Sequence, residues 1–320
     1  MTTTLHLYTP AGALAKAAPL RRAAKRLSAL GFDVCVDADA LTRHQRFGGD
    51  DDTRLAAIHR VAQAAPGVAL ATRGGYGMTR LLDRIDWPLL ARSVERGTRW
   101  VGQSDLTALQ LGLLAHASGI TWSGPLGCDD FGADEVDDVT QACFTEALSG
   151  ELEGIGFRTE PGFDGIELRG RLWGGNLCMV NSLLGTPHWP GSKVTRGGVL
   201  FLEDVGEHPY RIERMLLQLH QAGVLDAQKA IVLGAFSAIR KVPQDRGYGL
   251  KTVVAHLRSI TRTPILTGLP FGHVPTKVML PVGARVTLLV ERRDVFIGWD
   301  HDHAPGHAHD HAQAHTHNIG

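Results

Sequence analysis

Short apolar runs alternate with longer amphipathic stretches through the first third of the chain. The apolar runs end at glycine, proline or polar residues, which predicts strands at residues 5–10, 32–37, 67–72 and 99–103. The stretches between and after them carry apolar residues at helical spacing, at residues 14–31, 54–65, 78–85 and 105–118. This alternation predicts a parallel sheet with helices on both faces, whose ligands bind at the carboxyl ends of the strands.

The pattern changes after about residue 126. Residues 127–165 are acidic, helical in part and then rich in loops, which indicates a linker with a helical segment. Further strands are predicted at residues 170–177, 197–204, 229–236, 278–291 and 295–299, with helices at 210–223 and 250–260. We therefore predict an α/β fold with a parallel-sheet amino-terminal domain at 1–126 and a smaller mixed α/β carboxyl-terminal domain at 166–299.

The last segment, residues 300–320, has low complexity and is predicted to be a disordered histidine-rich tail. A solvated extension is one interpretation of it, and weak binding of nickel, zinc or copper by neutral imidazoles is the other. The histidines concerned are His301, His303, His307, His309, His311, His315 and His317.

Composition narrows the possible partners and the compartment. Lys plus Arg equals Asp plus Glu at 33 each, and this balance gives no support for nucleic acid or an anionic membrane as partner. The chain start lacks the order of a secretory signal, and no apolar run approaches the length of a membrane-spanning helix. The four cysteines have no paired spacing, which is typical of reduced core residues, so we expect a cytoplasmic protein.

Ser104 lies in the turn between the strand at 99–103 and the helix that follows. One interpretation makes it the N-cap of that helix, because a serine oxygen accepts an unpaired backbone N–H there. The other makes it a nucleophile at a tight strand-to-helix turn, close to N–H groups that can hold an oxyanion. Gly102 suits such a turn, but Leu106 stands where a G-x-S-x-G pattern has its second glycine, and spacing alone favours the cap.

Four other positions have polar chemistry at predicted strand ends or loops. The segment RGGYG at 73–77 can present N–H groups to an anion, or it is only a tight turn. The same two interpretations apply to the GGN segment that ends at Asn176. Glu203 follows an apolar strand, where a carboxylate either is solvated or orients a histidine. His273 lies in a Gly/Pro-rich loop, as an exposed residue or a general base.

Five long motifs together resemble one family, the LD-carboxypeptidases, which are serine peptidases that include murein tetrapeptide carboxypeptidase. The resemblance covers nearly all of residues 5–299 and keeps the sequence order of the family. The motifs are RGGYG…RLLDRIDW, VGQSDLTALQLGLLAHASGITWSGP, GRLWGGNLCMVNSLLGTPHWP, LFLEDVGEHPYRIERMLLQLHQAGVLDAQKAIVLGAFS and GLPFGHVPTKVMLPVGA.

The resemblance implies a Ser-Glu-His triad and an activity. Ser104 matches the nucleophile, Glu203 the orienting carboxylate and His273 the general base, with the backbone N–H groups of Gly75 and Asp105 as oxyanion donors. It also implies hydrolysis of muropeptide tetrapeptides between the L-centre of the third residue and the terminal D-alanine, in peptidoglycan recycling, without a cofactor or an active-site metal. A related activity in the family, hydrolysis of peptidyl or aminoacyl nucleotides in microcin immunity, is the alternative.

The resemblance leaves substrate contacts and assembly less defined. A carboxypeptidase must bind a free carboxylate, and we expect Arg73, Gly74 and Asn176 to contact the substrate. A homodimer is expected from the family. Gln103 departs from the aromatic residue or histidine expected beside the nucleophile, a change that alters the entry to Ser104.

Overall fold

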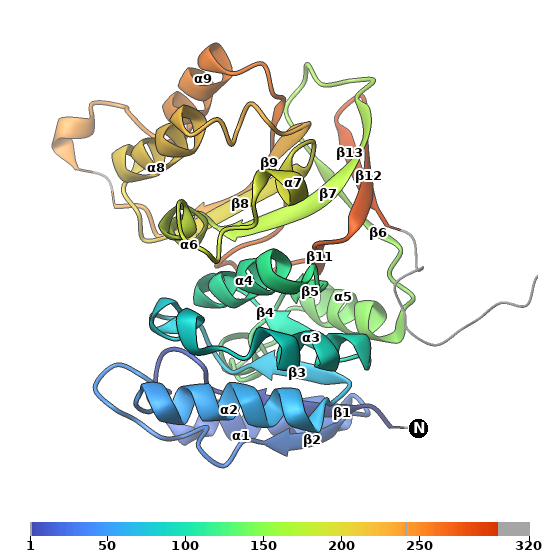
Figure 1. The fold of residues 1–320 in the computed structure, drawn as a ribbon. Helices are drawn as coiled ribbons and strands as arrows, with labels where there is room; N and C mark the ends of the chain where they lie inside the picture. The colour runs from blue at the N-terminus through green and yellow to red at the C-terminus, as the bar shows by residue number, and fades with distance from the viewer. Residues whose placement is uncertain (1, 241, 300–320) are drawn as a thin grey trace, which may run out of the picture.

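The computed structural model describes residues 2–240 and 242–299, and they form two β-sheets flanked by helices (Figure 1). The first sheet has the strand order β11-β5-β4-β3-β1-β2. Its five amino-terminal strands are parallel, and β11 pairs with β5 in the antiparallel direction. The strands are β1 (Thr4–Tyr8), β2 (Asp33–Val36), β3 (Val68–Ala71), β4 (Arg99–Gly102), β5 (Thr121–Ser123) and β11 (Leu280–Val282).

Helices cover both faces of this sheet, as the alternation predicts. They are α1 (Ala17–Ala29), α2 (Asp51–Ala64), α3 (Trp87–Glu95), α4 (Thr107–Ala117) and α5 (Asp138–Ser149). Successive strand residues point to opposite faces, so Val68 and Leu70 pack in the cluster that holds α1 and α5. Ala69 and Ala71, between and after them, pack in the cluster that holds α2, α3 and α4.

The segment at 78–85 differs from its prediction as one helix. It forms two 3₁₀ turns, η1 (Met78–Arg80) and η2 (Leu82–Arg84). The chain leaves a left-handed Gly77 at φ +146°, and the Asp86 side chain already caps α3, whose first turn contains a proline. The eight residues between these two fixed points hold short turns rather than a regular helix.

The second sheet is mixed, with the order β10-β9-β8-β7-β12-β13-β6. Strands β10 to β7 run parallel, and the remaining pairs are antiparallel. The strands are β6 (Gly154–Arg158), β7 (Glu167–Asn176), β8 (Val199–Val205), β9 (Ala230–Ser237), β10 (Ile265–Thr267), β12 (Arg285–Glu291) and β13 (Asp294–Gly298). Its helices are α6 (Leu177–Leu183), α7 (Ser192–Thr195), α8 (Pro209–Gln221) and α9 (Leu250–Ile260). The predicted fold class is confirmed, and β6, from the segment predicted as a linker, pairs with β13 at the edge of this sheet.

The stretch 278–291, predicted as one strand, divides between the two sheets. Its first part is β11 in the first sheet, and its second part is β12 in the second. Gly283 lies between them in the left-handed region at φ +99°, where a glycine has no Cβ to clash. The carboxyl-terminal half of the chain therefore returns to complete the amino-terminal sheet.

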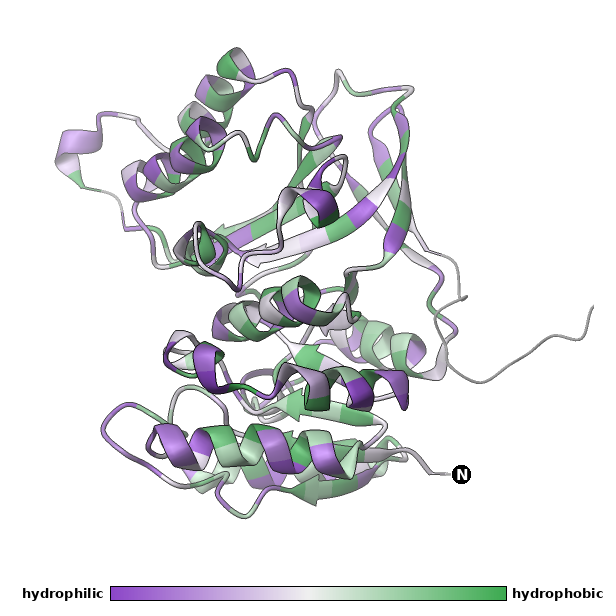
Figure 2. Ribbon diagram, viewed as in Figure 1, coloured by the Kyte–Doolittle hydropathy of each residue, from purple (hydrophilic) through white to green (hydrophobic). Residues whose placement is uncertain are grey.

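Helix α4 lies at the junction of the two halves (Figure 1). Its residues from Thr107 to Leu114 are all buried, because the helix packs on the first sheet on one side and on β7 and α6 on the other. In Figure 2 the strands of the first sheet are largely hydrophobic. Hydrophobic and hydrophilic residues alternate along α2, as in a helix with one face toward solvent. The apolar core is continuous across the junction, which fixes the loops that meet there.

Within the described ranges, no helix combines the length and the apolar character that crossing a membrane requires.

Candidate active site

Ser104 stands at a strained corner between β4 and α4. It is the first residue of a 3₁₀ turn, η3 (Ser104–Leu106), and its φ is +64°. A non-glycine residue in the left-handed region is uncommon, and such strain concentrates at functional sites. The N-cap positions of η3 and α4 belong to Gln103 and Leu106, and Ser104 makes no capping hydrogen bond. The helix-cap interpretation is therefore wrong, and the backbone has the form of a nucleophile turn.

The glycine-rich loop after β3 lies directly against this serine. A Cβ atom at position 74 would stand 2.6 Å from Cβ of Ser104 and 2.7 Å from its Oγ, and 3.5 Å from the backbone nitrogen of Asp105. The carbonyl of Gly74 accepts the N–H of Gly12 at 3.0 Å, which fixes the loop to the end of β1. Gly75 follows with φ +107°, a conformation that favours glycine.

Asp105 ties the same loop to the turn that carries Ser104. Its buried carboxylate accepts the N–H of Met78 at 2.8 Å. Below the loop, the fully buried Arg54 donates to the carbonyls of Pro10 and Gly77 at 3.1 and 2.9 Å. Burial raises the pKa of Asp105 to about 6, against the opposing effects of the Met78 N–H and the Arg54 charge. The loops after β1, β3 and β4 are thus joined by one buried polar network.

Glu203 and His273 form a second group, from the carboxyl-terminal half. Glu203 is completely buried on β8, and His273 lies in the loop between β10 and β11. The Nδ1 atom of His273 is 2.8 Å from Oε2 of Glu203. Burial lowers the pKa of His273, but the hydrogen bond to Glu203 and the charges of Glu203 and Asp204 outweigh it, so the pKa is raised above its ordinary value. The carboxylate therefore orients the ring and stabilises its protonated form.

Asn176 holds this carboxylate. It ends β7 opposite Glu203, and its amide nitrogen donates to Oε1 of Glu203 at 3.2 Å and to Oδ1 of Asp204 at 3.0 Å. Its side-chain oxygen accepts the N–H of Met179, so it also caps α6. Sequence analysis missed the role of Asn176 in positioning Glu203, because that contact depends on the register of β7 against β8. Substrate contact by Asn176 stays a prediction.

Arg73 packs beside the glycine-rich loop. One of its terminal nitrogens donates to the carbonyl of Ala13 at 3.0 Å, and its Nε atom is buried without a partner among the described residues. Its charge acts on Asp129, where burial raises the pKa and Arg73 opposes that rise. Contact between Arg73 and a substrate carboxylate stays a prediction.

One cavity is lined by a neighbour of Ser104 and by His273. Gln103, which directly precedes Ser104, and His273 both line a space of about 360 Å³. Among the described residues Ser104 Oγ has no hydrogen-bond partner, as is common for a nucleophile in a free enzyme, where such bonds tighten when substrate binds. A serine hydroxyl, a carboxylate-paired imidazole and nearby backbone N–H groups are the components of acyl transfer.

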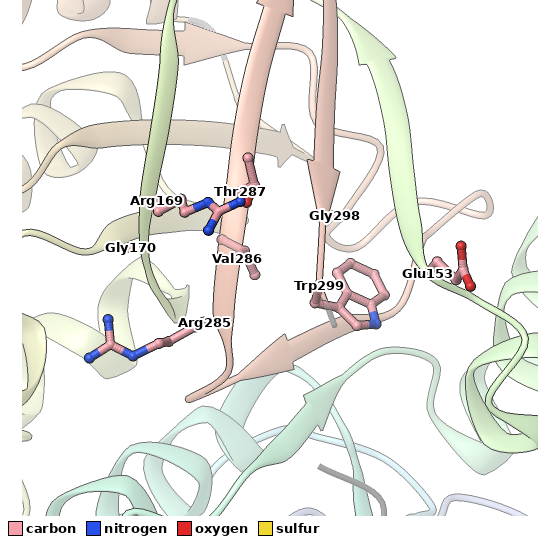
Figure 3. Close-up of a pocket in the computed structure, with 8 residues that line it drawn as sticks. All are labelled: Glu153, Arg169, Gly170, Arg285, Val286, Thr287, Gly298 and Trp299. Atoms are coloured by element: carbon pink, nitrogen blue, oxygen red, sulfur yellow. The ribbon is translucent and has the colours of Figure 1, made fainter. Parts of the chain in front are cut away.

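A second cavity, of about 590 Å³, lies along β7, β12 and β13 (Figure 3). Arg169, Arg285 and Trp299 are among its lining residues, and none of the predicted site residues is. The seven tail histidines fall outside the described residues. Inside those residues, no group of three or more His, Cys, Asp or Glu side chains is placed to hold a metal ion.

Comparison with known proteins identifies the family of this chain. Residues 5–124 match the model of the LD-carboxypeptidase N-terminal domain, and residues 169–288 match that of the C-terminal domain. A probable murein peptide carboxypeptidase of Bacillus subtilis is 32% identical over 274 residues, which cover 82% of this chain and 81% of the relative. The microcin C7 self-immunity protein of Escherichia coli is 26% identical over 257 residues, covering 71% and 72% of the two chains.

A solved structure gives the same result. The crystal structure of muramoyltetrapeptide carboxypeptidase from Oxalobacter formigenes superimposes with a TM-score of 0.84 at 37% identity, over 92% of this chain and 99% of that one. The same family therefore matches both halves of the chain in sequence, and a protein named for this activity matches them in fold. The chain belongs to the LD-carboxypeptidase family.

Proposed function

We propose that this protein is a serine-type LD-carboxypeptidase that removes the terminal D-alanine from muropeptide tetrapeptides. The bond cleaved joins the L-centre of the third-residue diamino acid to D-alanine. The observation that carries the proposal is that His273, paired with Glu203, lines the same cavity as Gln103, the residue before the strained Ser104. The names of the relatives from Bacillus and Oxalobacter support the substrate class.

In the proposed mechanism, Ser104 Oγ attacks the scissile carbonyl carbon while Nε2 of His273 takes its proton. The negative oxygen of the tetrahedral intermediate accepts the backbone N–H groups of Gly75 and Asp105. His273 then gives the proton to the departing amine of D-alanine, which leaves an acyl-enzyme ester. Water, deprotonated by His273, hydrolyses the ester and restores Ser104. Through both halves Glu203 stabilises the imidazolium.

The cellular role follows from the chemistry of the substrate. We propose a cytoplasmic enzyme of peptidoglycan recycling that acts as a homodimer on peptides returned from the wall. The second candidate is hydrolysis of aminoacyl or peptidyl nucleotides, which the likeness to the microcin C7 self-immunity protein favours. The same triad would serve both activities, so the acyl group and leaving group decide between them.

The test is D-alanine release from L-Ala-γ-D-Glu-meso-diaminopimelyl-D-Ala, with EDTA present throughout. We expect release by the wild type and its near abolition in Ser104→Ala. Ser118→Ala is the matched control, because Ser118 is also in the left-handed region but lies exposed at the other end of α4. Absence of release by folded wild type, with cleavage of an aminoacyl sulfamoyl adenylate, would replace the proposal with the second candidate. Equal release by wild type and Ser104→Ala would remove Ser104 from the mechanism.

A further inference from the structure

The cavity of about 590 Å³ lies against the antiparallel part of the second sheet (Figure 3). We call it the arginine cavity, because Arg169 and Arg285 are among its lining residues. Its size is within the range of sites that bind small molecules. It shares no residue with the proposed mechanism, so a ligand held there would occupy a place separate from the triad.

Three arginines share one face of the sheet at this cavity. The register of β7 against β12 places Arg171 directly opposite Arg285, and Arg169 opposite Thr287. Residues two apart on a strand point to the same side, so Arg169 lies diagonally across from Arg285, within reach of long side chains. The strand pairing therefore gathers positive charge at one wall.

The fold does not neutralise these charges. Within residues 2–240 and 242–299, the side chains of Arg169 and Arg285 make no hydrogen bond or ion pair, and Arg171 donates to the carbonyl of Gly283. Glu167, two residues before Arg169 on the same strand, forms no ion pair with described residues either. Burial lowers the pKa of Arg171, and the charge of Arg285 lowers it further. Like charges directly opposite one another destabilise a sheet, so a bound anion would relieve an unfavourable arrangement.

The other end of the cavity is aromatic and acidic. Trp299 lies there, and its ring meets the edge of Trp122 with 6.1 Å between centroids and 76° between planes. Its backbone N–H donates to the carbonyl of Glu153 at 2.9 Å, which fixes the aromatic wall. The Glu153 side chain lies at this end too, on the far side of Trp299 from the arginines (Figure 3). The anionic part of a ligand is therefore directed toward the arginines and away from Glu153.

A phosphate-bearing ligand fits these walls. Guanidinium groups bind phosphate through paired N–H···O hydrogen bonds, and a diphosphate has enough negative charge to offset more than one arginine. A planar ring can stack on the indole of Trp299. We propose that the arginine cavity is a second binding site, for a ligand of the nucleoside diphosphate class. Its phosphates would contact Arg169 and Arg285, and its ring would lie against Trp299.

The experiment is calorimetric titration of the full chain with ADP, inorganic pyrophosphate and adenosine, with EDTA present throughout. We expect wild type to bind ADP, to bind pyrophosphate more weakly and to show no binding of adenosine. Arg285→Gln and Arg169→Gln should each weaken ADP binding about tenfold, as for the loss of a hydrogen bond to a charged group. Trp299→Leu should weaken the binding of ADP but not of pyrophosphate.

Arg158→Gln is the matched control. Arg158 is on β6 of the same sheet, but it pairs with Asp294 at 3.2 Å and does not line the cavity. Its affinity for ADP should equal that of wild type. Without ligand, Arg285→Gln should raise Tm by about 1–2 °C, because it removes the repulsion from Arg171. This rise also shows that the variant is folded.

Two outcomes would overturn the inference. One is the absence of ADP binding by wild type, or equal ADP affinity in wild type and both arginine variants. The other is a change of oligomeric state in Arg285→Gln, measured by sedimentation, with ADP affinity unchanged, which would assign this face to contact between copies of the chain. D-alanine release should be the same in all the variants, so the titration stands apart from the test of the proposed function.

Discussion

The carboxylate of Asp105 accepts the backbone N–H of Met78 at 2.8 Å, and this contact joins the two loops of the proposed oxyanion site. The backbone nitrogen of Asp105 is one proposed oxyanion donor, and the loop that ends at Met78 carries the other, Gly75. In this proposal one residue serves twice, because its main chain would donate to the oxyanion while its side chain holds the partner loop. Oxyanion stabilisation depends on donors that are fixed before the reaction begins.

Replacing Asp105 by alanine should release the glycine-rich loop. We expect Asp105→Ala to lower kcat by about 10²-fold, the order seen when one oxyanion donor is lost. Asp105→Asn keeps an oxygen for the Met78 N–H and should retain most of the activity. Steady-state kinetics on the tetrapeptide measures both. Equal losses in the two variants would show that the charge, rather than the hydrogen bond to the loop, matters.

Comparison of Asp105→Asn with wild type tests how the free energy of unfolding depends on pH. The pKa of Asp105 is raised to about 6 in the fold, so the folded state binds this proton more tightly than the unfolded chain does. Its contribution to the free energy of unfolding is greatest below about pH 4 and is lost as pH rises through about 6. Asp105→Asn should therefore be more stable than wild type near pH 8, by about 1–3 kcal/mol. Urea unfolding at a series of pH values measures this, and a wild-type advantage at pH 8 would contradict it.

Position 74 tests the approach of the loop to the nucleophile. In Gly74→Ala the new methyl would stand 2.6 Å from Cβ of Ser104, so one of the two segments must shift. We expect a loss of about 1–3 kcal/mol in the free energy of unfolding, as for other overpacked sites, and a loss of activity. The loss of stability should be smaller in a Ser104→Gly background, where the colliding atoms are gone.

Gly191→Ala is the control for that double-mutant cycle, because a Cβ at position 191 meets nothing within 4 Å. It should leave both stability and activity near wild type. Additive effects of Gly74→Ala and Ser104→Gly would mean that the two residues do not press on one another.

Glu203→Gln separates the orienting role of the carboxylate from its charge. We expect kcat/KM to fall about 10³–10⁴-fold, as in other triads that lose this charge. The charge and hydrogen bond of Glu203 raise the pKa of His273, while burial lowers it, so removing the charge should lower that pKa. The acid limb of the kcat/KM profile, which reports the free base, should move to lower pH.

Glu207→Gln is the matched control for the pH profile, since Glu207 follows β8 but pairs with Arg211 at the start of α8. Its acid limb should coincide with that of the wild type. An unmoved limb in Glu203→Gln would show that a group other than His273 titrates there.

Local pattern accounts for much of the fold. Alternating strands and helices, glycines at turns and a serine after β4 are properties of neighbouring residues, so they can be read along the chain. The motifs of the family resemblance then named Ser104, Glu203 and His273 as candidates. The segment at 78–85 and the stretch 278–291 were predicted incorrectly, because Asp86 and Gly283 act there through capping and a left-handed turn, which depend on the surrounding structure.

Contacts between residues far apart in sequence were decided only by the tertiary structure. The hydrogen bond from His273 to Glu203 spans 70 positions, and the buried Lys277–Asp130 pair spans 147. Side-chain type limits which groups can pair, but strand order and register decide which ones meet. The sequence by itself therefore determined the elements and the candidate chemistry, while the packing of two sheets against α4 determined the site.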